Sequence, residues 1–281
     1  MRKWASWLLA LAILIFGYIL YGYLSKPSHP ELVFLSVGQG DCAVIRTGGR
    51  VVLIDVGPRS ENFDAGARVV APKLRQMGIS RVDMVILSHP DADHIGGLAG
   101  LSKKVTIGEV IFSRAFEKSA PLIQSLIDAN LPSSRWRMVS KSTFFKVGEV
   151  QFFLFAPHWN RQTESDNEGS LFVKVQSKNA SALFTGDASD ETEYEMIRAA
   201  NWKCDLLKAG HHGSSGATSD GWLEVVRPKA IVFSCGRDNS YGHPARDTLD
   251  RATRRKIRSF RTDLQGDLRF IFTEKGLAYA P

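Results

Sequence analysis

The sequence feature that most constrains the fold is a buried strand that ends in a cluster of metal-binding side chains. Residues 83–88 have the pattern of a buried strand, and His89, Asp91, Asp93 and His94 follow within six residues. Ligands between a strand and a helix can converge on one pocket. His89 and Asp91 can face one ion, and Asp93 and His94 a second. The alternative is a polar turn in which Asp93 caps the next helix, but this concentration of ligands favours a metal site.

Later loops repeat this design. Thr185-Gly186-Asp187 and Gly210-His211-His212-Gly213 each follow an apolar run, and five of the seven histidines, His243 included, lie in glycine-containing loops at predicted strand ends. A Gly-Asp pair alone is a common turn. Beside a His/Asp cluster, however, the two oxygens of Asp187 can reach different cations while its charge offsets their repulsion. We therefore interpret Asp187 as a bridging ligand.

Strand patterns and helix patterns share the rest of the chain. The predicted strands cover residues 32–37, 42–46, 51–55, 83–88, 150–156, 171–176, 182–185, 204–208, 230–234 and 268–273. The predicted helices cover residues 67–77, 121–129, 191–200, 221–226 and 246–256. The strands begin as a meander and then alternate with helices, and the pattern restarts after about Phe144. This order predicts an α/β fold with two stacked sheets and helices outside them.

The N-terminal part of the chain has a different character. Residues 4–24 carry no charge, and at about 1.5 Å per residue a helix of this length reaches about 31 Å, the thickness of a bilayer core. They predict a single transmembrane anchor between a basic tail, residues 1–3, and a linker, residues 25–30. Arg2 and Lys3 favour a cytoplasmic N-terminus, so the domain, residues 31–281, is expected outside the cell. The alternative is a cleaved signal peptide.

Composition excludes several classes of protein. With 44% hydrophobic and 23% charged residues, the chain is neither disordered nor fibrous. Three scattered cysteines are too few for a disulfide framework or a thiolate zinc site. The formal net charge of +7 points to polyanions or a membrane surface as partners, and the sequence identifies no protein partner.

The positive charge of the domain is concentrated near its C-terminus. Residues 244–281 contain nine basic and five acidic residues, whereas residues 31–243 are neutral. We predict that one basic helix after His243 contacts the phosphates of DNA. Its contact residues would be Arg251, Arg254, Arg255 and Arg258. A solvated helix face is the alternative, because Asp247 and Asp250 are interleaved with the arginines.

The ordered motifs resemble the metallo-β-lactamase superfamily. They are His-x-Asp-x-Asp-His-Ile-Gly-Gly, Thr-Gly-Asp, Gly-His-His-Gly-Ser and Tyr-Gly-His-Pro. Phe34-Leu-Ser-Val-Gly-Gln-Gly-Asp41, Leu53-Ile-Asp-Val-Gly57 and Asp166-Asn-Glu-Gly-Ser-Leu171 are similar to the extracellular hydrolase domain of ComEC-type competence proteins, which take up DNA. The resemblance covers about residues 32–273. It implies a four-layer αββα sandwich with two metal ions between the sheet edges.

The resemblance also implies roles for single residues. His89 and Asp91 would hold the first metal ion, and Asp93 and His94 the second. Asp187 would bridge them, and either His211 or His212 would complete the second site. Asp41 and Asp55 would orient ligands or loops. Asp93 and His243 are the predicted catalytic residues, with His243 beside the leaving group.

Two departures from the commoner superfamily pattern bear on the metal. Aspartate stands at position 91 instead of histidine, and the chain offers Asp166-Asn167 where a further histidine is usual. Both are shared with the ComEC branch. They make the first site richer in oxygen, so manganese is as plausible a cofactor as zinc.

These features predict a membrane-anchored, metal-dependent phosphodiesterase, a nuclease acting on extracellular DNA. Two cations about 3.5 to 4 Å apart would activate water and clamp a phosphodiester. One alternative is hydrolysis of a cell-surface phosphoester such as phosphorylcholine. Another is a DNA-binding receptor with a vestigial site, although no ligand of the pattern is missing.

Overall fold

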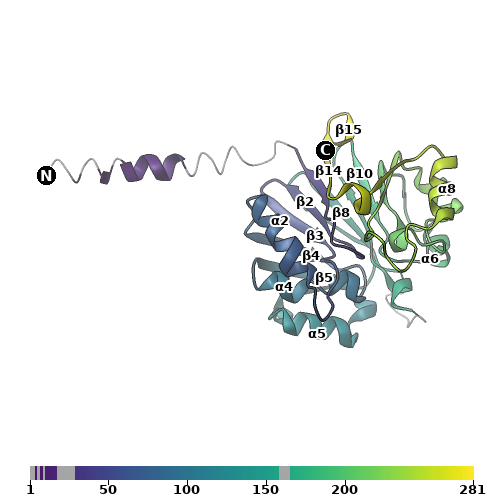
Figure 1. The fold of residues 1–281 in the computed structure, drawn as a ribbon, viewed down its shortest axis with the longest axis horizontal. Helices are drawn as coiled ribbons and strands as arrows, with labels where there is room; N and C mark the ends of the chain where they lie inside the picture. Colours follow the sequence, from purple (N-terminus) through teal and green to yellow (C-terminus); the bar gives the residue numbers. More distant parts are fainter. Residues whose placement is uncertain (1–3, 5–6, 9, 18–28, 158–164) are drawn as a thin grey trace.

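Two mixed β-sheets lie face to face in the computed structural model, which describes residues 4, 7–8, 10–17, 29–157 and 165–281 (Figure 1). The first sheet has the order β15-β14-β1-β2-β3-β4-β5-β6 and the second β13-β12-β11-β10-β9-β8-β7. The strands of the first sheet are β1 (Glu31–Phe34), β2 (Ala43–Thr47), β3 (Arg50–Ile54), β4 (Arg81–Ile86), β5 (Thr106–Ser113), β6 (Trp136–Val139), β14 (Leu268–Thr273) and β15 (Gly276–Tyr279). Those of the second are β7 (Thr143–Val147), β8 (Val150–Phe155), β9 (Phe172–Gln176), β10 (Ser181–Phe184), β11 (Leu206–Lys208), β12 (Ala230–Phe233) and β13 (Arg258–Arg261).

Helices cover the outer faces of both sheets. The first sheet carries the π-helical turn η1 (Gly66–Val70) and helices α2 (Ala71–Gln76), α3 (Ala92–Ile95), α4 (Leu98–Ser102) and α5 (Ala120–Asp128). The second carries α6 (Asp190–Met196), α7 (Asp220–Val226) and α8 (Arg246–Arg254). A short helix, α9 (Thr262–Gln265), follows β13.

Three apolar clusters separate these four layers. One packs the first sheet against its helices, a second joins the two sheets, and a third packs the second sheet against its helices. Central strands such as β1 and β11 are therefore buried along their whole length, as expected for strands covered on both faces. This confirms the predicted α/β sandwich of two sheets.

The structure corrects some predicted elements. The predicted helix 67–77 consists of η1 and α2, joined end to end. Strands β5, β6, β7 and β13 were not predicted, because charged or polar residues interrupt their apolar residues, and β15 was not predicted because it has only four residues. The basic helix, predicted over residues 246–256, ends at Arg254. Arg258, which we expected on that helix, lies on β13, with its guanidinium 4.7 Å from the Phe260 ring centroid.

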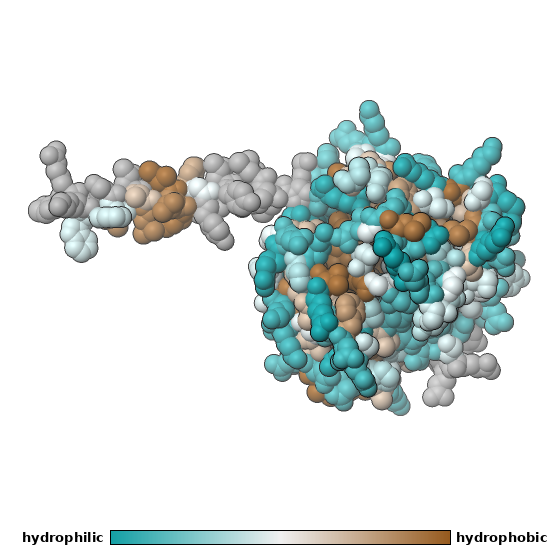
Figure 2. Space-filling view, viewed as in Figure 1, coloured by the Kyte–Doolittle hydropathy of each residue, from teal (hydrophilic) through white to brown (hydrophobic). Residues whose placement is uncertain are grey.

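The predicted anchor, tail and linker lie largely outside the described residues. Within residues 4–24, residues 10–17 are helical, and their apolar side chains are exposed (Figure 2). In the part of the chain that the structure describes, no helix is long and apolar enough to span a bilayer.

Parallel strands start at one end of the sandwich and finish at the other. Strands β1 and β3 to β6 of the first sheet, and β8 and β10 to β13 of the second, run in the same sense within their sheets. We call the end where these strands begin the basal end and the opposite end the site end. All the predicted metal-binding loops leave strands at the site end.

Backbone contacts hold the site-end loops together. Val56 N–H donates to the carbonyl of His94 at 2.8 Å, and Gly97 N–H donates to Gly57 at 2.9 Å. A Cβ atom added to Gly66 would overlap the carbonyl oxygen of Gly97. The absence of side chains at these two glycines therefore lets η1 approach the loop that carries the metal-binding cluster.

Candidate metal centre

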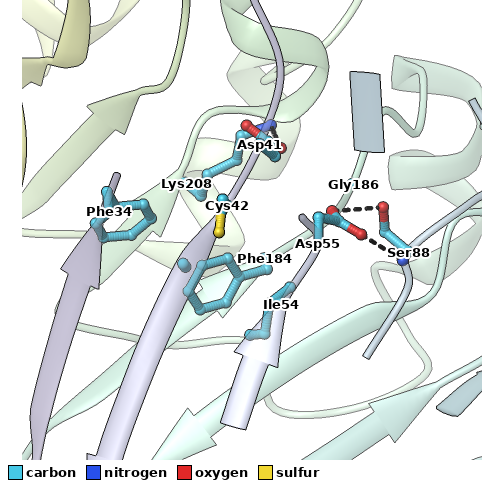
Figure 3. Close-up of a pocket in the computed structure, with 10 residues that line it drawn as sticks. Phe34, Asp41, Cys42, Ile54, Asp55, Ser88, Phe184, Gly186 and Lys208 are labelled. Atoms are coloured by element: carbon cyan, nitrogen blue, oxygen red, sulfur yellow. Dashed lines mark hydrogen bonds and ion pairs between the residues drawn. The ribbon is translucent and has the colours of Figure 1, made fainter. Parts of the chain in front are cut away.

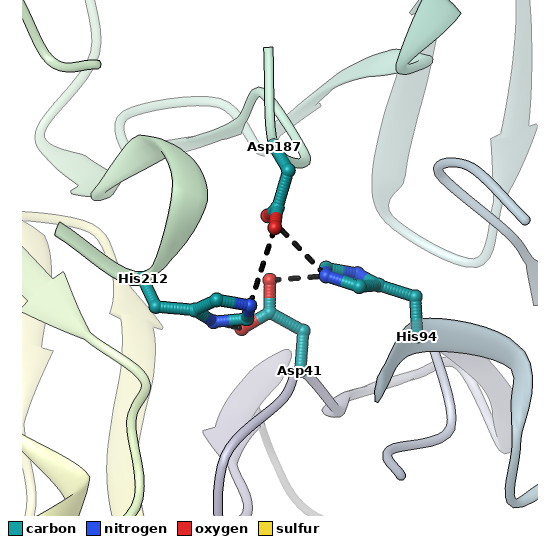
Figure 4. Close-up of side chains that lie close together, drawn as sticks. All are labelled: Asp41, His94, Asp187 and His212. Carbon is teal, nitrogen blue, oxygen red and sulfur yellow. Dashed lines mark ion pairs between the residues drawn. The ribbon is translucent and has the colours of Figure 1, made fainter. Parts of the chain in front are cut away.

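Four buried side chains meet between the ends of the two sheets (Figure 4). Asp41 follows β1, His94 lies on α3, Asp187 follows β10, and His212 follows β11. Each offers a ligand atom, and these atoms all lie within 4.8 Å of one another. This cluster is the geometric centre of the candidate site.

Asp187 lies between the two histidines. Its Oδ1 is 3.3 Å from His94 Nε2, and its Oδ2 is 3.3 Å from His212 Nε2. The half-buried Asp93 approaches the same nitrogen of His212 at 3.2 Å. His212 Nε2 thus lies between Asp93 and Asp187, and Asp187 also faces His94.

The unpaired atoms of the site fit a metal ion. Among the described residues, His89 Nε2, His94 Nε2 and Asp187 Oδ1 are buried side-chain atoms without a hydrogen-bond partner. Buried polar atoms are rarely left unsatisfied unless water or an ion contacts them. Nitrogen and oxygen donors of this kind suit zinc or manganese. The residues present therefore fit the divalent cofactor that the sequence predicts.

Electrostatics in the site favour positive charge. Burial disfavours an imidazolium, yet the pKa of His94 is raised well above its ordinary value by Asp187 and Asp55. Burial likewise opposes charge on His212, whose pKa is raised well above its ordinary value by Asp187 and Asp41. A site whose carboxylates hold protons on both buried histidines will also attract a cation.

The predicted ligands of the first metal ion form a looser group. His89 is buried and its ring centroid lies 4.0 Å from that of His94, whereas its Nε2 is 3.6 Å from Asp91 Oδ2. Asp91 is half exposed. Burial and the charge of Asp91 raise the pKa of Asp166, which faces the same place. Asp166, which stands where the commoner superfamily pattern has a further histidine, thus lies near His89 and Asp91.

Asp55 and Ser88, which Figure 3 shows joined by hydrogen bonds, position His94. Asp55 Oδ2 lies 2.8 Å from His94 Nδ1 and accepts a hydrogen bond from Ser88 Oγ at 2.8 Å. The backbone N–H of Ser88 donates to Asp55 Oδ1 at 2.8 Å. A carboxylate behind a metal-ligating histidine fixes the ring and its tautomer. Asp55 was predicted to orient ligands, whereas Ser88 was not singled out from the sequence.

Lys208 is a buried cation that the sequence analysis missed. It ends β11, is 2% exposed, and forms an ion pair with Asp41 (Figure 3). Its Nζ also lies 3.7 Å from Asp187 Oδ1. Burial raises the pKa of Asp41, but Lys208 and His212 outweigh it and lower that pKa well below its ordinary value. A lysine within a predicted strand usually faces solvent. Only its position two residues before Gly210-His211-His212 could have identified Lys208 as a residue of the site.

The two adjacent histidines do not lie on an extended segment. His211 and His212 both have positive φ, 47° and 54°, so they form a left-handed turn. His212 is buried, with Nδ1 2.9 Å from the carbonyl oxygen of Ser234. His211 stays more exposed at the rim, with Nε2 3.7 Å from Asp187 Oδ2. The geometry therefore favours His212 as the inner ligand.

His243 lies at the rim of the centre. Its ring centroid is 5.7 Å from that of His211 and 6.3 Å from that of His212. Asn239 holds its backbone, and Gln39 Nε2 lies 3.5 Å from its Nδ1. Burial and the neighbouring His212 lower its pKa. A neutral imidazole here can donate one hydrogen bond and accept another.

A cavity of about 790 Å³ opens beside the first metal position. Asp91 and Asp166 lie on its wall, together with Phe63, Arg59 and Asp128. Its size suits a small ligand or one unit of a polymer.

The predicted DNA-binding arginines are engaged with the protein surface. Arg254 and Arg255 lie 3.5 Å and 3.0 Å from the carboxylate of Asp220. Arg251 donates to the carbonyl of Ser215 at 2.8 Å. Arg254 and Arg255 thus pair with Asp220, and Arg251 with a backbone carbonyl. The interleaved Asp247 and Asp250 are not the partners of these three arginines among the described residues.

Comparisons with known proteins identify relatives of this chain. Residues 35–237 match the metallo-beta-lactamase superfamily. The chain is 29% identical over 273 residues to ComE operon protein 3 of Bacillus subtilis, covering 92% of this chain and 35% of that protein. It is 30% identical over 273 residues to Recombination protein 2 of Haemophilus influenzae, covering 95% and 32%. The chain therefore spans about a third of the length of these curated relatives.

A solved structure supports the fold. The metallo-beta-lactamase fold protein YhfI from Bacillus subtilis superposes with a TM-score of 0.53 at 12% identity, covering 83% of this chain and 95% of that one. At this identity, the likeness concerns the fold.

Proposed function

Because this chain belongs to the metallo-β-lactamase superfamily, we propose that it is a metal-dependent phosphodiesterase that cleaves DNA outside the cell. The observation that carries the proposal is Asp187, whose two oxygens lie 3.3 Å from His94 Nε2 and from His212 Nε2. Its ComEC-type relatives, one of them called a recombination protein, support DNA as the substrate.

Two groups of residues would hold the metal ions. His89, Asp91 and Asp166 would bind the first, Asp93, His94 and His212 the second, and Asp187 both. Two divalent ions, zinc or manganese, would supply an activated water molecule and neutralise the charge of the phosphodiester. Asp55 and Ser88 hold the His94 ring in place, and Lys208 balances the charge of Asp41 and Asp187.

His243 would act on the leaving oxygen. As a neutral ring at the rim, it can donate a hydrogen bond to that oxygen as the P–O bond breaks. Gln39 and Asn239 fix the ring and its backbone and keep the donor in place.

The N-terminal run of residues 4–24 would tether the domain to the cell membrane as a single-pass anchor, with the hydrolase outside. The exposed apolar side chains of residues 10–17 support this proposal. Arg2 and Lys3 before the run favour the orientation.

Hydrolysis of a phosphoester with a cationic group is the second candidate, because the cavity wall carries Glu61, Asp64 and Asp128 beside Phe63. Carboxylates and an aromatic ring suit a quaternary ammonium. Comparing DNA with a phosphorylcholine ester as substrates separates the two.

The first test removes a ligand. Asp93→Ala should abolish hydrolysis of DNA and of a small chromogenic phosphodiester and lower the bound metal, because the second metal ion would lose a carboxylate ligand and His212 Nε2 would lose the carboxylate 3.2 Å away. Asp250→Ala, an exposed aspartate of α8, is the matched control. Full activity of Asp93→Ala with a normal circular dichroism spectrum would contradict the proposed site.

The second test concerns DNA as substrate. Replacing Arg251, Arg254 and Arg255 with Gln should flatten the salt dependence of DNA binding by about 0.9 in the slope of log K against log salt for each lost phosphate contact. Turnover of the small diester should not change. Lys103→Gln/Lys104→Gln/Lys178→Gln removes the same charge from the basal end and serves as control. An unchanged slope would mean that these arginines do not contact DNA and that α8 only exposes a solvated face.

A further inference from the structure

The basal end forms one continuous surface across both sheets. Asn179 Nδ2, in the β9–β10 turn, donates to the carbonyl of Glu274 in the β14–β15 turn at 2.7 Å. Glu149 N–H, in the β7–β8 turn, donates to Thr47 Oγ1 at the end of β2 at 3.0 Å. The turns of the two sheets therefore lie side by side at this end.

Basic residues are concentrated on this surface. Its turns are residues 47–50, 78–81, 102–106, 148–149, 177–181, 201–205, 227–230, 256–258 and 274–275. Together they contain eleven Lys or Arg and only three Asp or Glu. The net charge of these turns is therefore 11 − 3 = +8. Because the whole domain of residues 31–281 has a net charge of +4, the rest of the domain has a net charge of −4.

Many of these charges are available to a partner. Six basal lysines are exposed, and no carboxylate among the described residues lies within 4 Å of them: Lys103, Lys104, Lys178, Lys203, Lys256 and Lys275. By contrast, Arg50 pairs with Asp83 at 2.7 Å, and Lys229 with Asp205 at 2.8 Å.

The site end has the opposite charge. Its loops, residues 35–42, 55–65, 87–97, 114–119, 140–142, 165–171, 185–190, 209–219, 234–245 and 262–267, contain fourteen Asp or Glu and five Lys or Arg. Even two divalent cations would leave this end negative. The domain is therefore electrically polar along its strands.

The N-terminal segment enters the domain at the basal end. Pro30 accepts a hydrogen bond from Phe272 N–H at 2.9 Å, and β1 begins at Glu31, beside the last residues of β14 (Figure 1). At about 3.5 Å per residue, the chain from Leu24 to Glu31, which includes the six residues between them, reaches at most about 25 Å. An anchored domain would thus keep its basal end close to the bilayer.

We propose that the basal end docks on the surface of a bilayer that contains anionic lipids, so that the metal centre faces away from the membrane. This inference rests on the anchoring part of the proposed function and adds a binding partner and an orientation. Lysines close to an anionic leaflet are attracted to it, and the acidic site end is repelled.

DNA fits this surface less well than lipid does. The basal lysines lie at the far end of the strands from Asp187, so a strand bound to them would not reach the metal centre. The apolar segment that leaves the same end specifies a bilayer as the neighbour.

The test uses the full chain in nanodiscs of phosphatidylcholine alone or of equal parts phosphatidylcholine and phosphatidylglycerol. Acetylation by a water-soluble reagent, read by mass spectrometry, reports the exposure of each lysine. Lys103, Lys104 and Lys229 should react more slowly in the anionic discs, and Lys118 and Lys141 at the site end should not. Salt at about 1 M should remove the difference, because it shortens the screening length to about 3 Å.

A charge variant tests the cause. Lys178→Gln/Lys275→Gln should weaken docking about thirty-fold, since each basic residue near an anionic leaflet contributes about 1 kcal/mol. Lys103 and Lys104 should then react as in the neutral discs. Lys118→Gln/Lys141→Gln removes equal charge from the site end and should leave the protection intact.

The outcomes separate this proposal from those it rests on. Equal acetylation in both discs overturns docking, as does protection by duplex DNA but not by phosphatidylglycerol. Hydrolysis of a phosphodiester in the same discs tests the enzyme independently. If the chain does not insert into the bilayer, the proposed anchor is wrong, and flotation of the protein with anionic vesicles then tests docking alone. Salt-sensitive binding that is lost in Lys178→Gln/Lys275→Gln supports docking by the basal end. Absence of binding overturns it.

Discussion

At the scale of single residues, Asp55 shows how the fold prepares a ligand. It has a positive φ of 58°, a conformation that Asn and Asp tolerate better than most residues. This conformation follows β3 directly and turns the carboxylate toward Ser88 and His94. The residue therefore acts through His94 without being part of the inner cluster.

We predict that Asp55→Asn lowers metal affinity and phosphodiester hydrolysis by about 10- to 100-fold, as is typical for partners of metal-ligating histidines. Asparagine keeps the backbone conformation and the size of the side chain, so the loss reports the carboxylate itself. The measurements are metal titration and turnover. Wild-type affinity with reduced turnover would assign Asp55 another role.

The sequence indicated the His/Asp loops because their spacing is local. It did not indicate that Asp41 joins His94, Asp187 and His212, or that Lys208 pairs with Asp41, because these contacts link strands far apart in the chain. Nor could spacing choose between His211 and His212, since the choice depends on a left-handed turn.

At the scale of elements, α6 links two loops of the metal centre. Thr192 donates to Glu168, two residues after Asp166, and the neighbouring Glu193 accepts N–H groups from Thr218 and Ser219 at 2.7 Å and 2.9 Å. Thr218 Oγ1 in turn accepts from Gly210 N–H at 2.9 Å, just before the paired histidines. Helix α6 was predicted from its apolar spacing, but its polar contacts to both loops were not.

Glu193 makes stability depend on pH. Burial outweighs its backbone hydrogen bonds and raises its pKa from 4.5 to about 7. The folded state therefore holds the proton longer than the unfolded chain does. The stability that Glu193 contributes is fully present below pH 4.5 and falls by about 3 kcal/mol as the pH rises to 7.

We expect Glu193→Gln to remove this fall, measured by urea unfolding between pH 4.5 and 8. Glu191→Gln, an exposed neighbour on α6, is the matched control and should keep it. An unchanged pH profile in Glu193→Gln would mean that other groups dominate the titration.

At the scale of the whole molecule, the apolar core lies in the two-sheet domain. In the part of the chain that the structure describes, all three apolar clusters are built from residues after position 31, and the first backbone contact to the sheets is made by Pro30. The layered architecture was predictable because alternating strands and helices limit the arrangement. Edge strands such as β6 and β7 were not, because their outward residues are exposed and interrupt the apolar pattern.

Deleting residues 1–29 should therefore give a soluble protein that unfolds cooperatively and retains hydrolysis of a small phosphodiester. Thermal unfolding followed by circular dichroism, beside turnover of the full chain in detergent, measures this. Aggregation or loss of the cooperative transition would show that the domain boundary near residue 31 is wrong.

The close approach of Gly66 to Gly97 bears on how such a sequence can diverge. Since the loop bearing Asp93 and His94 is located by main-chain contacts at these glycines and at Val56 and Gly57, its position depends little on which aliphatic side chains fill the adjoining core. Apolar residues there can be exchanged over generations without displacing the ligands, whereas either glycine is nearly fixed. Substitutions should therefore accumulate faster among the apolar residues of the adjoining core than at Gly66 and Gly97.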